Sequence, residues 1–199
     1  CDFNFLLRCN TVNGLIALIV SVGMTNKMYF KIIKQSKISK ARLGSLATAH
    51  GVIKTPFFMP DATRGAVKSL SNDDLKHLGL SALVINTYHL YLQPGLEVIK
   101  KAKGAHKFMD WHGPLLSDSG GYQVFSLIHK NKGLGKITDD KVIFRSPLDG
   151  AKHELTPEKS IQIQFDLGVD MMVCLDDCPS NDIGDADMMA AINRTVAWA

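Results

Sequence analysis

The sequence predicts an α/β protein, the first half of a (β/α)8 TIM barrel preceded by a small antiparallel sheet. Short apolar runs recur, and a helical pattern follows each one. The runs lack polar alternation, which is typical of parallel strands buried on both faces and joined by crossover helices. No glycine-rich dinucleotide fingerprint follows the first run, at residues 61–65, which favours the barrel over a doubly wound fold. The chain has 199 residues, whereas a complete barrel needs about 250.

The bulk composition is that of a globular protein with a core, since 46% of the residues are hydrophobic. A net charge of +4 permits binding to a polyanion but does not argue for it. The four cysteines form no Cys-x-x-Cys pair and no zinc-finger pattern. They indicate reduced thiols in a cytoplasmic protein.

Residues 1–23 are expected to be an upstream extension that is not part of the natural protein. The chain begins with Cys1, and a normal cytosolic start can be placed at Met24. The apolar run of residues 15–22 is too short to span a bilayer. Only Arg8 precedes it and no clear cleavage site follows, so it is a poor signal peptide. We therefore expect no contact with a membrane.

Residues 24–55 are predicted to form the N-terminal antiparallel sheet. From Lys27 to Arg42 the chain carries six basic residues and no acid, and Phe30, Ile32 and Ile33 suggest a short strand. Lysines on an exposed edge strand discourage sheet-to-sheet pairing. This interpretation is preferred to an RNA contact.

Residues 56–199 are predicted to hold four βα units. Residues 55–60 are the first strand, and a capping box at 71–74 then begins a helix that Gly79 ends. Residues 82–85 and 114–116 are the second and third strands, with a helix at 96–105 between them.

Residues 131–155 interrupt this order and are interpreted as an insertion with a hairpin strand at 142–144. Thr156-Pro157-Glu158 caps the next helix, which Gly168 ends. Residues 171–175 are the fourth strand. Met188, Ile192 and Val196 mark a last helix at the chain end.

Polar residues follow every predicted strand, and in a barrel these positions form the active-site rim. They are Asp61 after the first strand, Asn86, Thr87, Tyr88 and His89 after the second, Asp118 to Gln123 after the third, and Asp176, Asp177 and Cys178 after the fourth.

The third cluster is the strongest candidate site. Gly120 and Gly121 let the backbone approach a ligand closely. Asp118 can transfer a proton or hydrogen-bond a polar ring edge, and Tyr122 can stack on a flat base. The alternative is an Asp-Ser-Gly-Gly turn that only joins strand to helix. The second carboxylate at the same rim favours function.

Several other rim residues keep two interpretations. Asp176 or Asp177 can accept the paired N–H donors of guanine, cap a helix or bind a metal, and the spacing does not decide which one faces inward. Asn86 can orient Asp118 or serve as a turn amide. His89 is a candidate acid or base but fits a structural histidine near Tyr88 better.

The segments 86–90, 117–127, 144–147, 155–160 and 175–179 resemble those of bacterial tRNA-guanine transglycosylases. The 117–127 segment reads Ser-Asp-Ser-Gly-Gly-Tyr-Gln-Val-Phe-Ser-Leu. The resemblance runs from about Lys31 to the chain end, with the motifs in the same order and spacing. The 117–127 segment is long and specific, so chance is a poor explanation.

The resemblance implies a barrel with an N-terminal antiparallel sheet. It also implies an enzyme that exchanges guanine at the tRNA wobble position for a 7-deazaguanine base, a queuosine precursor. In that reaction an aspartate attacks the anomeric carbon and the incoming base displaces it, as in a retaining glycosidase. The implied partners are tRNA, the free base and, at full length, a second copy in a homodimer. A structural zinc and the nucleophile are expected beyond Ala199, so the chain alone is expected to be inactive.

The resemblance also implies roles for individual residues. Asp118 corresponds to the base-binding general acid and base, followed by the base-binding segment of Ser119, Gly120, Gly121 and Tyr122. Asp176 corresponds to the carboxylate that reads the guanine-like edge. Cys178 corresponds to a pocket-lining residue.

One position departs from the pattern, and two other functions stay open. Asp177 stands where the family commonly has Glu. The first alternative is a non-catalytic tRNA-binding paralogue or subunit of the same fold. The second is an unrelated barrel enzyme, such as a lyase that binds a metal through Asp118 and Asp176.

Overall fold

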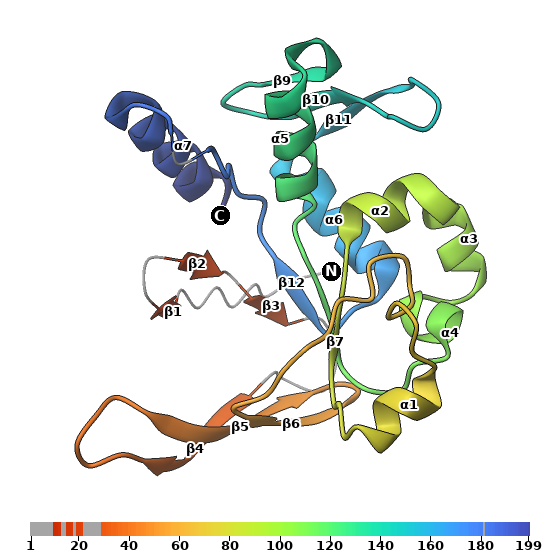
Figure 1. The fold of residues 1–199 in the computed structure, drawn as a ribbon, viewed down its shortest axis with the longest axis vertical. Coiled ribbons are helices and arrows are strands. Elements are labelled where there is room, and N and C mark those ends of the chain that lie inside the picture. The colour runs from red at the N-terminus through yellow and green to blue at the C-terminus, as the bar shows by residue number, and fades with distance from the viewer. Residues whose placement is uncertain (1–9, 13–14, 18, 22–28, 181) are drawn as a thin grey trace, which may run out of the picture.

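The computed structural model describes residues 10–12, 15–17, 19–21, 29–180 and 182–199, and it has a mixed α/β fold (Figure 1). Its centre is a four-stranded sheet in the order β3-β12-β8-β7. The strands are β3 (Ile19–Ser21), β7 (Leu83–Ile85), β8 (Leu115–Ser117) and β12 (Met171–Val173). β7, β8 and β12 are parallel neighbours, which confirms the predicted parallel sheet.

The described residues before Tyr29 form three short strands. β3 pairs antiparallel with β12 at the sheet edge, and β1 (Asn10–Val12) and β2 (Leu15–Ala17) form a separate two-stranded sheet. The predicted upstream extension, 1–23, lies partly outside the described residues and stays a prediction.

Helices separate the parallel strands along the chain. Between β7 and β8 lie α2 (Thr87–Leu90), the π-helical turn η1 (Tyr91–Gly95), α3 (Leu96–Lys101) and α4 (Ala105–Met109). The others are α1 (Asn72–His77), α5 (Gly121–Lys130), the 3-10 turn η2 (Lys132–Leu134), α6 (Pro157–Leu167) and α7 (Asp185–Trp198). The predicted helix at 96–105 is therefore two short helices.

The strand predicted at residues 55–60 is wrong. Thr55 ends β6, residues 56–60 form no strand, and the next pairing is an isolated parallel bridge between Asp61 and Val84. Val84 N donates to Pro60 O at 3.1 Å, and Ala62 N donates to Val84 O at 2.7 Å. Pro56 and Pro60 have no N–H to donate, so a ladder cannot extend through them. The segment still runs beside β7 in the predicted direction.

The predicted helix caps are confirmed. Ser71 and Asp74 form a complete capping box at α1. Thr156 Oγ1 accepts from Lys159 N at 3.1 Å at the start of α6. Gly168 ends α6 in the left-handed region, with φ of +69°, a conformation that glycine adopts without strain.

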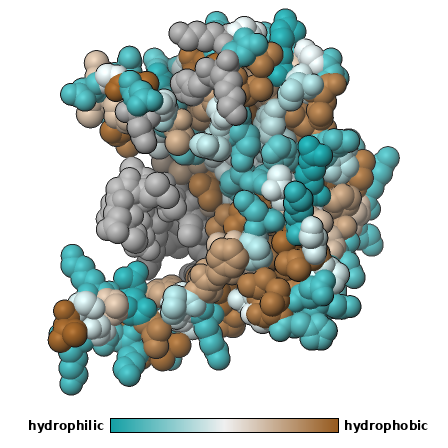
Figure 2. All heavy atoms as spheres, viewed as in Figure 1, coloured by the Kyte–Doolittle hydropathy of each residue, from teal (hydrophilic) through white to brown (hydrophobic). Residues whose placement is uncertain are grey.

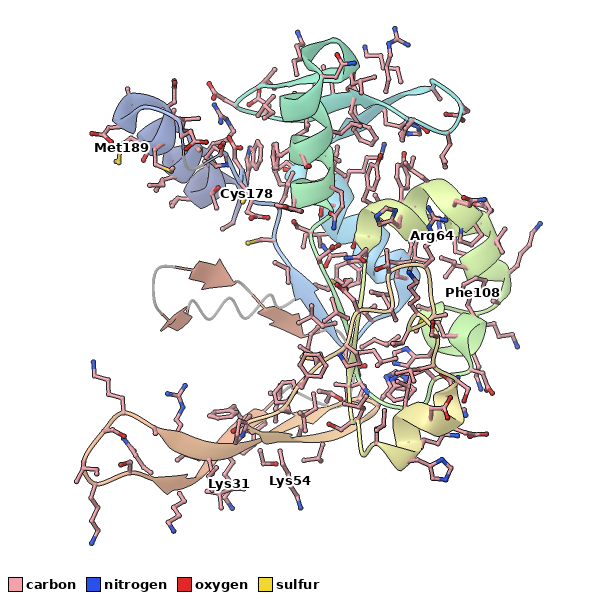
Figure 3. The ribbon with its side chains drawn as sticks, in the orientation of Figure 1. Lys31, Lys54, Arg64, Phe108, Cys178 and Met189 are labelled. Carbon is pink, nitrogen blue, oxygen red and sulfur yellow. The ribbon has the colours of Figure 1, made fainter. Side chains whose placement is uncertain are left out.

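The N-terminal antiparallel sheet is also confirmed, with strands β4 (Tyr29–Gln35), β5 (Arg42–Thr48) and β6 (Gly51–Thr55). β4 is exposed along its whole length. Lys31 and Lys54 point to solvent (Figure 3), as the edge-strand interpretation expects. Hydrophobic and hydrophilic residues alternate over this sheet in the space-filling view (Figure 2).

A hydrogen-bonded clasp joins this sheet to the parallel sheet. His50, in the turn between β5 and β6, donates to Asp170 Oδ1 from its backbone N at 3.1 Å and contacts it with Nδ1 at 2.9 Å. Leu115 N donates to Asp170 Oδ2 at 2.9 Å. Asp170 precedes β12 and Leu115 begins β8, so the clasp lies at the amino ends of the parallel strands.

The predicted insertion contains a second antiparallel sheet, in the order β11-β10-β9. Its strands are β9 (Gly135–Ile137), β10 (Val142–Arg145) and β11 (Lys152–Leu155). Phe144 of β10 and Phe125 of α5 are both buried in the main core. The sheet therefore packs on the molecule through α5.

The last helix is confirmed, but of its predicted apolar positions Met188 is half-buried and the other two are exposed. Ile192 is 45% and Val196 55% exposed, and Met189 points away from the body of the molecule (Figure 3). The buried residues of α7 are Ala191 and Trp198. Among the described residues, no helix combines the length and apolarity that a membrane span requires.

Candidate active site

The site lies where the three parallel strands end. Asn86 follows β7 directly, Asp118 follows β8 directly, and Asp176 lies three residues after β12. Asp118 N donates to Ile85 O at 3.2 Å, which continues the β7–β8 pairing into the loops. Because the carboxyl ends of parallel strands meet at one edge, these loops bring the predicted residues together.

Four donors hold the Asp118 carboxylate. Oδ2 accepts from Asn86 Nδ2 at 2.5 Å and from Gln123 Nε2 at 3.0 Å. Oδ1 accepts from Thr87 N at 2.8 Å and from Gly120 N at 3.2 Å. The donors come from the β7–α2 loop, the β8–α5 loop and α5, so Asp118 is fixed by two neighbouring βα units.

Ser119 links the two carboxylates of the rim. Its Oγ donates to Asp176 Oδ1 at 2.9 Å and accepts from Gly121 N at 3.1 Å. Its carbonyl accepts from Ser160 Oγ at 2.7 Å. Ser119 is 4% exposed. The side chain after Asp118 therefore points into the protein and ties β8 to the loop after β12.

The two glycines of the motif are required by the backbone. Gly120 has φ of +78°, which an L side chain rarely adopts. At Gly121 a Cβ would lie 2.8 Å from the carbonyl oxygen of Asp176. The sequence predicted close backbone approach here. In the structure the neighbour is the Asp176 loop itself.

The structure decides which carboxylate faces the site. Asp176 contacts Ser119, whereas Asp177 forms an ion pair with Arg194 of α7. Burial raises the pKa of Asp176, the hydrogen bond from Ser119 opposes the rise, and the charges of Asp118 and Asp177 add to it. The raised pKa favours the protonated form of Asp176.

Tyr122 and Cys178 are accessible at the rim. Tyr122 lies in the first turn of α5 and is 65% exposed, so its ring is free to stack on a flat ligand. Cys178 lies in the loop between β12 and α7 (Figure 3) and is exposed. Burial of its sulfur raises the thiol pKa, and the charges of Asp176 and Asp177 raise it further, which favours the unreactive thiol.

His89 has a structural setting. Its ring packs edge-on against Tyr88, with centroids 5.2 Å apart. Burial lowers the pKa of His89, Arg64 lowers it further, and Asp118 opposes both. The lowered pKa favours the neutral form of the His89 imidazole.

Sequence reasoning missed two supporting residues, Gln164 and Arg194, and assigned no role to Gln123, which it placed on the rim. Gln164, fully buried on α6, accepts from Ser117 Oγ at 2.8 Å and from Val173 N at 3.0 Å. It thus ties β8 to β12 beneath the site. A buried glutamine such as Gln164 gives no periodic signal. Gln123 stands in the first turn of the helix after Asp118, and this spacing could have indicated its contact with Asp118.

The described residues contain one grouping that offers metal ligands, His50, His106 and Asp170. It does not fit the expected structural zinc. The Asp170 carboxylate already accepts two backbone N–H bonds. The two nitrogens of His106 face oxygen atoms, Nδ1 the carbonyl of Gly168 at 3.1 Å and Nε2 that of Gly113 at 3.2 Å. Both nitrogens therefore already face oxygen atoms of the protein, which leaves neither free to bind a metal.

The fold and the site together define the class of protein. A parallel sheet whose loops bring polar side chains together at the carboxyl ends of its strands is the arrangement of α/β enzymes. The model of the queuine tRNA-ribosyltransferase family matches residues 36–199. The chain belongs to this family, whose name describes a transferase.

Curated relatives agree with this assignment. The chain is 45% identical over 184 residues to queuine tRNA-ribosyltransferase of Roseiflexus sp. (strain RS-1), covering 85% of this chain and 46% of the relative. It is 48% identical over 176 residues to that of Shouchella clausii (strain KSM-K16), covering 88% and 45%. The chain thus spans about half the length of these relatives. The family match overturns the second alternative from the sequence, an unrelated barrel lyase that binds a metal through Asp118 and Asp176.

Proposed function

We propose that the protein is a tRNA-guanine transglycosylase that replaces guanine at the tRNA wobble position by a 7-deazaguanine base. The names of the relatives support a transfer reaction on tRNA. The site geometry supports the finer assignment. To reach such a site the target nucleotide must leave its stack, as for other enzymes that act on a base.

The observation that carries the proposal is the bridge from Asp118 to Asp176 through Ser119. Asp118 is fixed from one side, and Ser119 turns the second carboxylate towards the same rim. Two carboxylates with different environments can take different roles. Asp176 accepts the paired N–H donors of a guanine-type base, and Tyr122 stacks on its ring.

Proton balance assigns the role of Asp118. Guanine leaves with the electron pair of the glycosidic bond and needs a proton, whereas the incoming base loses one when it bonds to the ribose. A single acid and base that serves both steps returns to its starting state. Asp118 accepts four hydrogen bonds in the free protein, so it must first take up a proton from solvent, in place of one of these donors, before it gives that proton to the departing guanine.

We also propose the domain layout, the place of the nucleophile and zinc ligands, and the assembly of the full-length protein. Residues 24–55 are the N-terminal sheet, residues 56–199 are four βα units with an insertion at about 131–155, and the sheet closes into a barrel at full length. The nucleophilic aspartate and the structural zinc ligands are assigned to sequence after Ala199. The full-length enzyme acts in the cytoplasm as a homodimer, and residues 1–199 alone are inactive.

The proposal is tested by incubating full-length protein with tRNA that carries labelled guanine at the wobble position and an unlabelled 7-deazaguanine base. Release of the labelled guanine with incorporation of the new base is the expected result. Binding of tRNA without release would favour the non-catalytic paralogue. Metal analysis of the same preparation is expected to find zinc.

A further inference from the structure

The two adjacent carboxylates after β12 are held by different elements. Asp176 receives its hydrogen bond from Ser119, in the loop between β8 and α5. Asp177 is held by α7: its carboxylate pairs with Arg194 Nη1, and its backbone N donates to Thr195 Oγ1 at 2.9 Å. The Asp177 side chain is 4% exposed and that of Arg194 18%. Removal of Arg194 would therefore leave a buried charge without its partner.

This ion pair lies beside the site rather than in it. Asp118, Asp176 and Asp177 place three acids in two neighbouring loops, and Asp176 has no ion pair among the described residues. Asp177 directly follows Asp176 in the chain; burial is the main cause of the raised pKa of Asp176, and the charges of Asp118 and Asp177 add to it. Arg194 pairs with Asp177 and offsets its negative charge.

We propose that Arg194 is a positioning residue which, through Asp177, keeps Asp176 ionised and turned towards Ser119 so that it can accept the N–H donors of a guanine-type base. This inference rests on the proposed function. α7 follows the Asp176 loop in sequence, so the same helix that closes the fourth βα unit sets the charge of the base-reading group.

Arg194 also has a purely structural contact, which provides a control. Its Nε and Nη2 reach Asp139 Oδ1 at 3.3 Å, and Asp139 is 93% exposed at its side chain. Trp198 Nε1 donates to Asp139 O at 2.6 Å. Asp139→Asn keeps this backbone contact and weakens only the exposed ion pair, which is worth little.

The first test is the pH dependence of KM for the 7-deazaguanine base in the full-length protein. The groups that face Asp176 are Asp118 and Ser119 from the β8–α5 loop, Asp177 and Cys178 from its own loop, and Arg194 through Asp177 from α7. In Arg194→Gln the unpaired Asp177 disfavours ionisation of Asp176. We expect KM for the base to rise at acidic pH, and the acidic loss of binding to move to higher pH.

Three further variants separate charge from structure. Arg194→Lys is expected to keep most of the wild-type profile, and Asp139→Asn all of it. Asp177→Asn combined with Arg194→Gln removes both charges and is expected to restore the profile towards wild type. An unchanged profile in Arg194→Gln, or a double variant as impaired as Arg194→Gln alone, would overturn the proposal.

The second test needs no catalysis. Cys178 senses the charges of Asp176 and Asp177, so its alkylation by iodoacetamide, followed by peptide mass spectrometry, reports the local field. We expect Arg194→Gln to slow the reaction and the double variant to restore it. An unchanged rate in Arg194→Gln contradicts the inference. If wild-type protein exchanges no base, the proposed function fails. The alkylation rate of Cys178 still decides whether Arg194 sets the charge around Asp176 and Asp177.

Discussion

Asn86 Nδ2 donates to Asp118 Oδ2 at 2.5 Å, which joins the residue that follows β7 to the residue that follows β8. The amide is 8% exposed, so water does not readily replace it. A hydrogen bond to a charged group contributes roughly 1.5–3 kcal/mol. The geometry of Asp118 therefore depends on the neighbouring βα unit.

Asn86→Ala is expected to lower kcat/KM for base exchange about 10- to 100-fold, the range that this loss of hydrogen-bond energy implies. Steady-state exchange with labelled guanine measures it. Asn72→Ala is the matched control, because Asn72 donates only to the backbone at Met109 and Asp110, away from the rim. Equal losses in both variants would show that Asn86 acts on stability alone.

Asp176→Asn is expected to weaken binding of the base and to alter the preference between guanine and 7-deazaguanine bases, because an amide has one acceptor oxygen where the carboxylate offers two to the paired N–H donors. Isothermal titration of each base measures both effects. In wild type the raised pKa of Asp176 means that base binding weakens as the pH falls through a value above the ordinary 3.8. Unchanged base preference in Asp176→Asn would count against its role.

Gly121→Ala is expected to disturb the site, because the new Cβ would meet the Asp176 carbonyl at 2.8 Å. Overpacking of this kind costs roughly 1–3 kcal/mol, measurable as a shift in the midpoint of denaturant unfolding. Base exchange should fall as well. Gly184→Ala is the control, since a Cβ there meets nothing within 4 Å, and it should leave both measurements near wild type.

Asp170→Asn is expected to loosen the clasp between the β4–β6 sheet and the parallel sheet. Removing one partner of a buried, hydrogen-bonded charge costs roughly 3–5 kcal/mol. Burial opposes ionisation of Asp170, but hydrogen bonds from His106, Leu115 and His50 outweigh it and hold its pKa well below the usual range. Its stabilisation is therefore present above the unfolded value of about 3.9 and is lost as the pH falls through the lower folded value.

Thermal unfolding of wild type and Asp170→Asn from pH 7 downwards measures this clasp. The difference in stability between the two proteins should be largest near neutrality and shrink in strong acid. Asp73→Asn, which alters an aspartate 81% exposed at its side chain, should show no such difference. A constant difference at every pH would mean that the charge of Asp170 is not what the clasp depends on.

Much of the fold was predictable because its signals are local. The capping residues Ser71 and Thr156 and the glycine that ends α6 have fixed chemistry at helix ends, and the structure has them as expected. The prediction of a strand at 55–60 was wrong because it gave the apolar residues more weight than Pro56 and Pro60. Prolines limit the backbone donors whatever the side chains favour.

From the sequence, the site could be predicted only as the group of polar residues that follow the strands. The sequence placed Asp118, Asn86 and Asp176 at one edge, but the choice between Asp176 and Asp177 depends on Arg194, which contacts the loop from the next helix. The clasp of His50 with Asp170 joins residues 120 positions apart. Such contacts are set by tertiary packing and have no signature in spacing.

The most direct test of the account is labelled-guanine exchange into tRNA by full-length Asp118→Asn, with Asp73→Asn as the control. The variant keeps the size of the side chain but cannot take up and return the proton that the exchange requires. We predict near-complete loss of exchange in Asp118→Asn, with tRNA binding retained and Asp73→Asn fully active. Exchange at the wild-type rate in Asp118→Asn would contradict the assignment of this residue as the acid and base of the site.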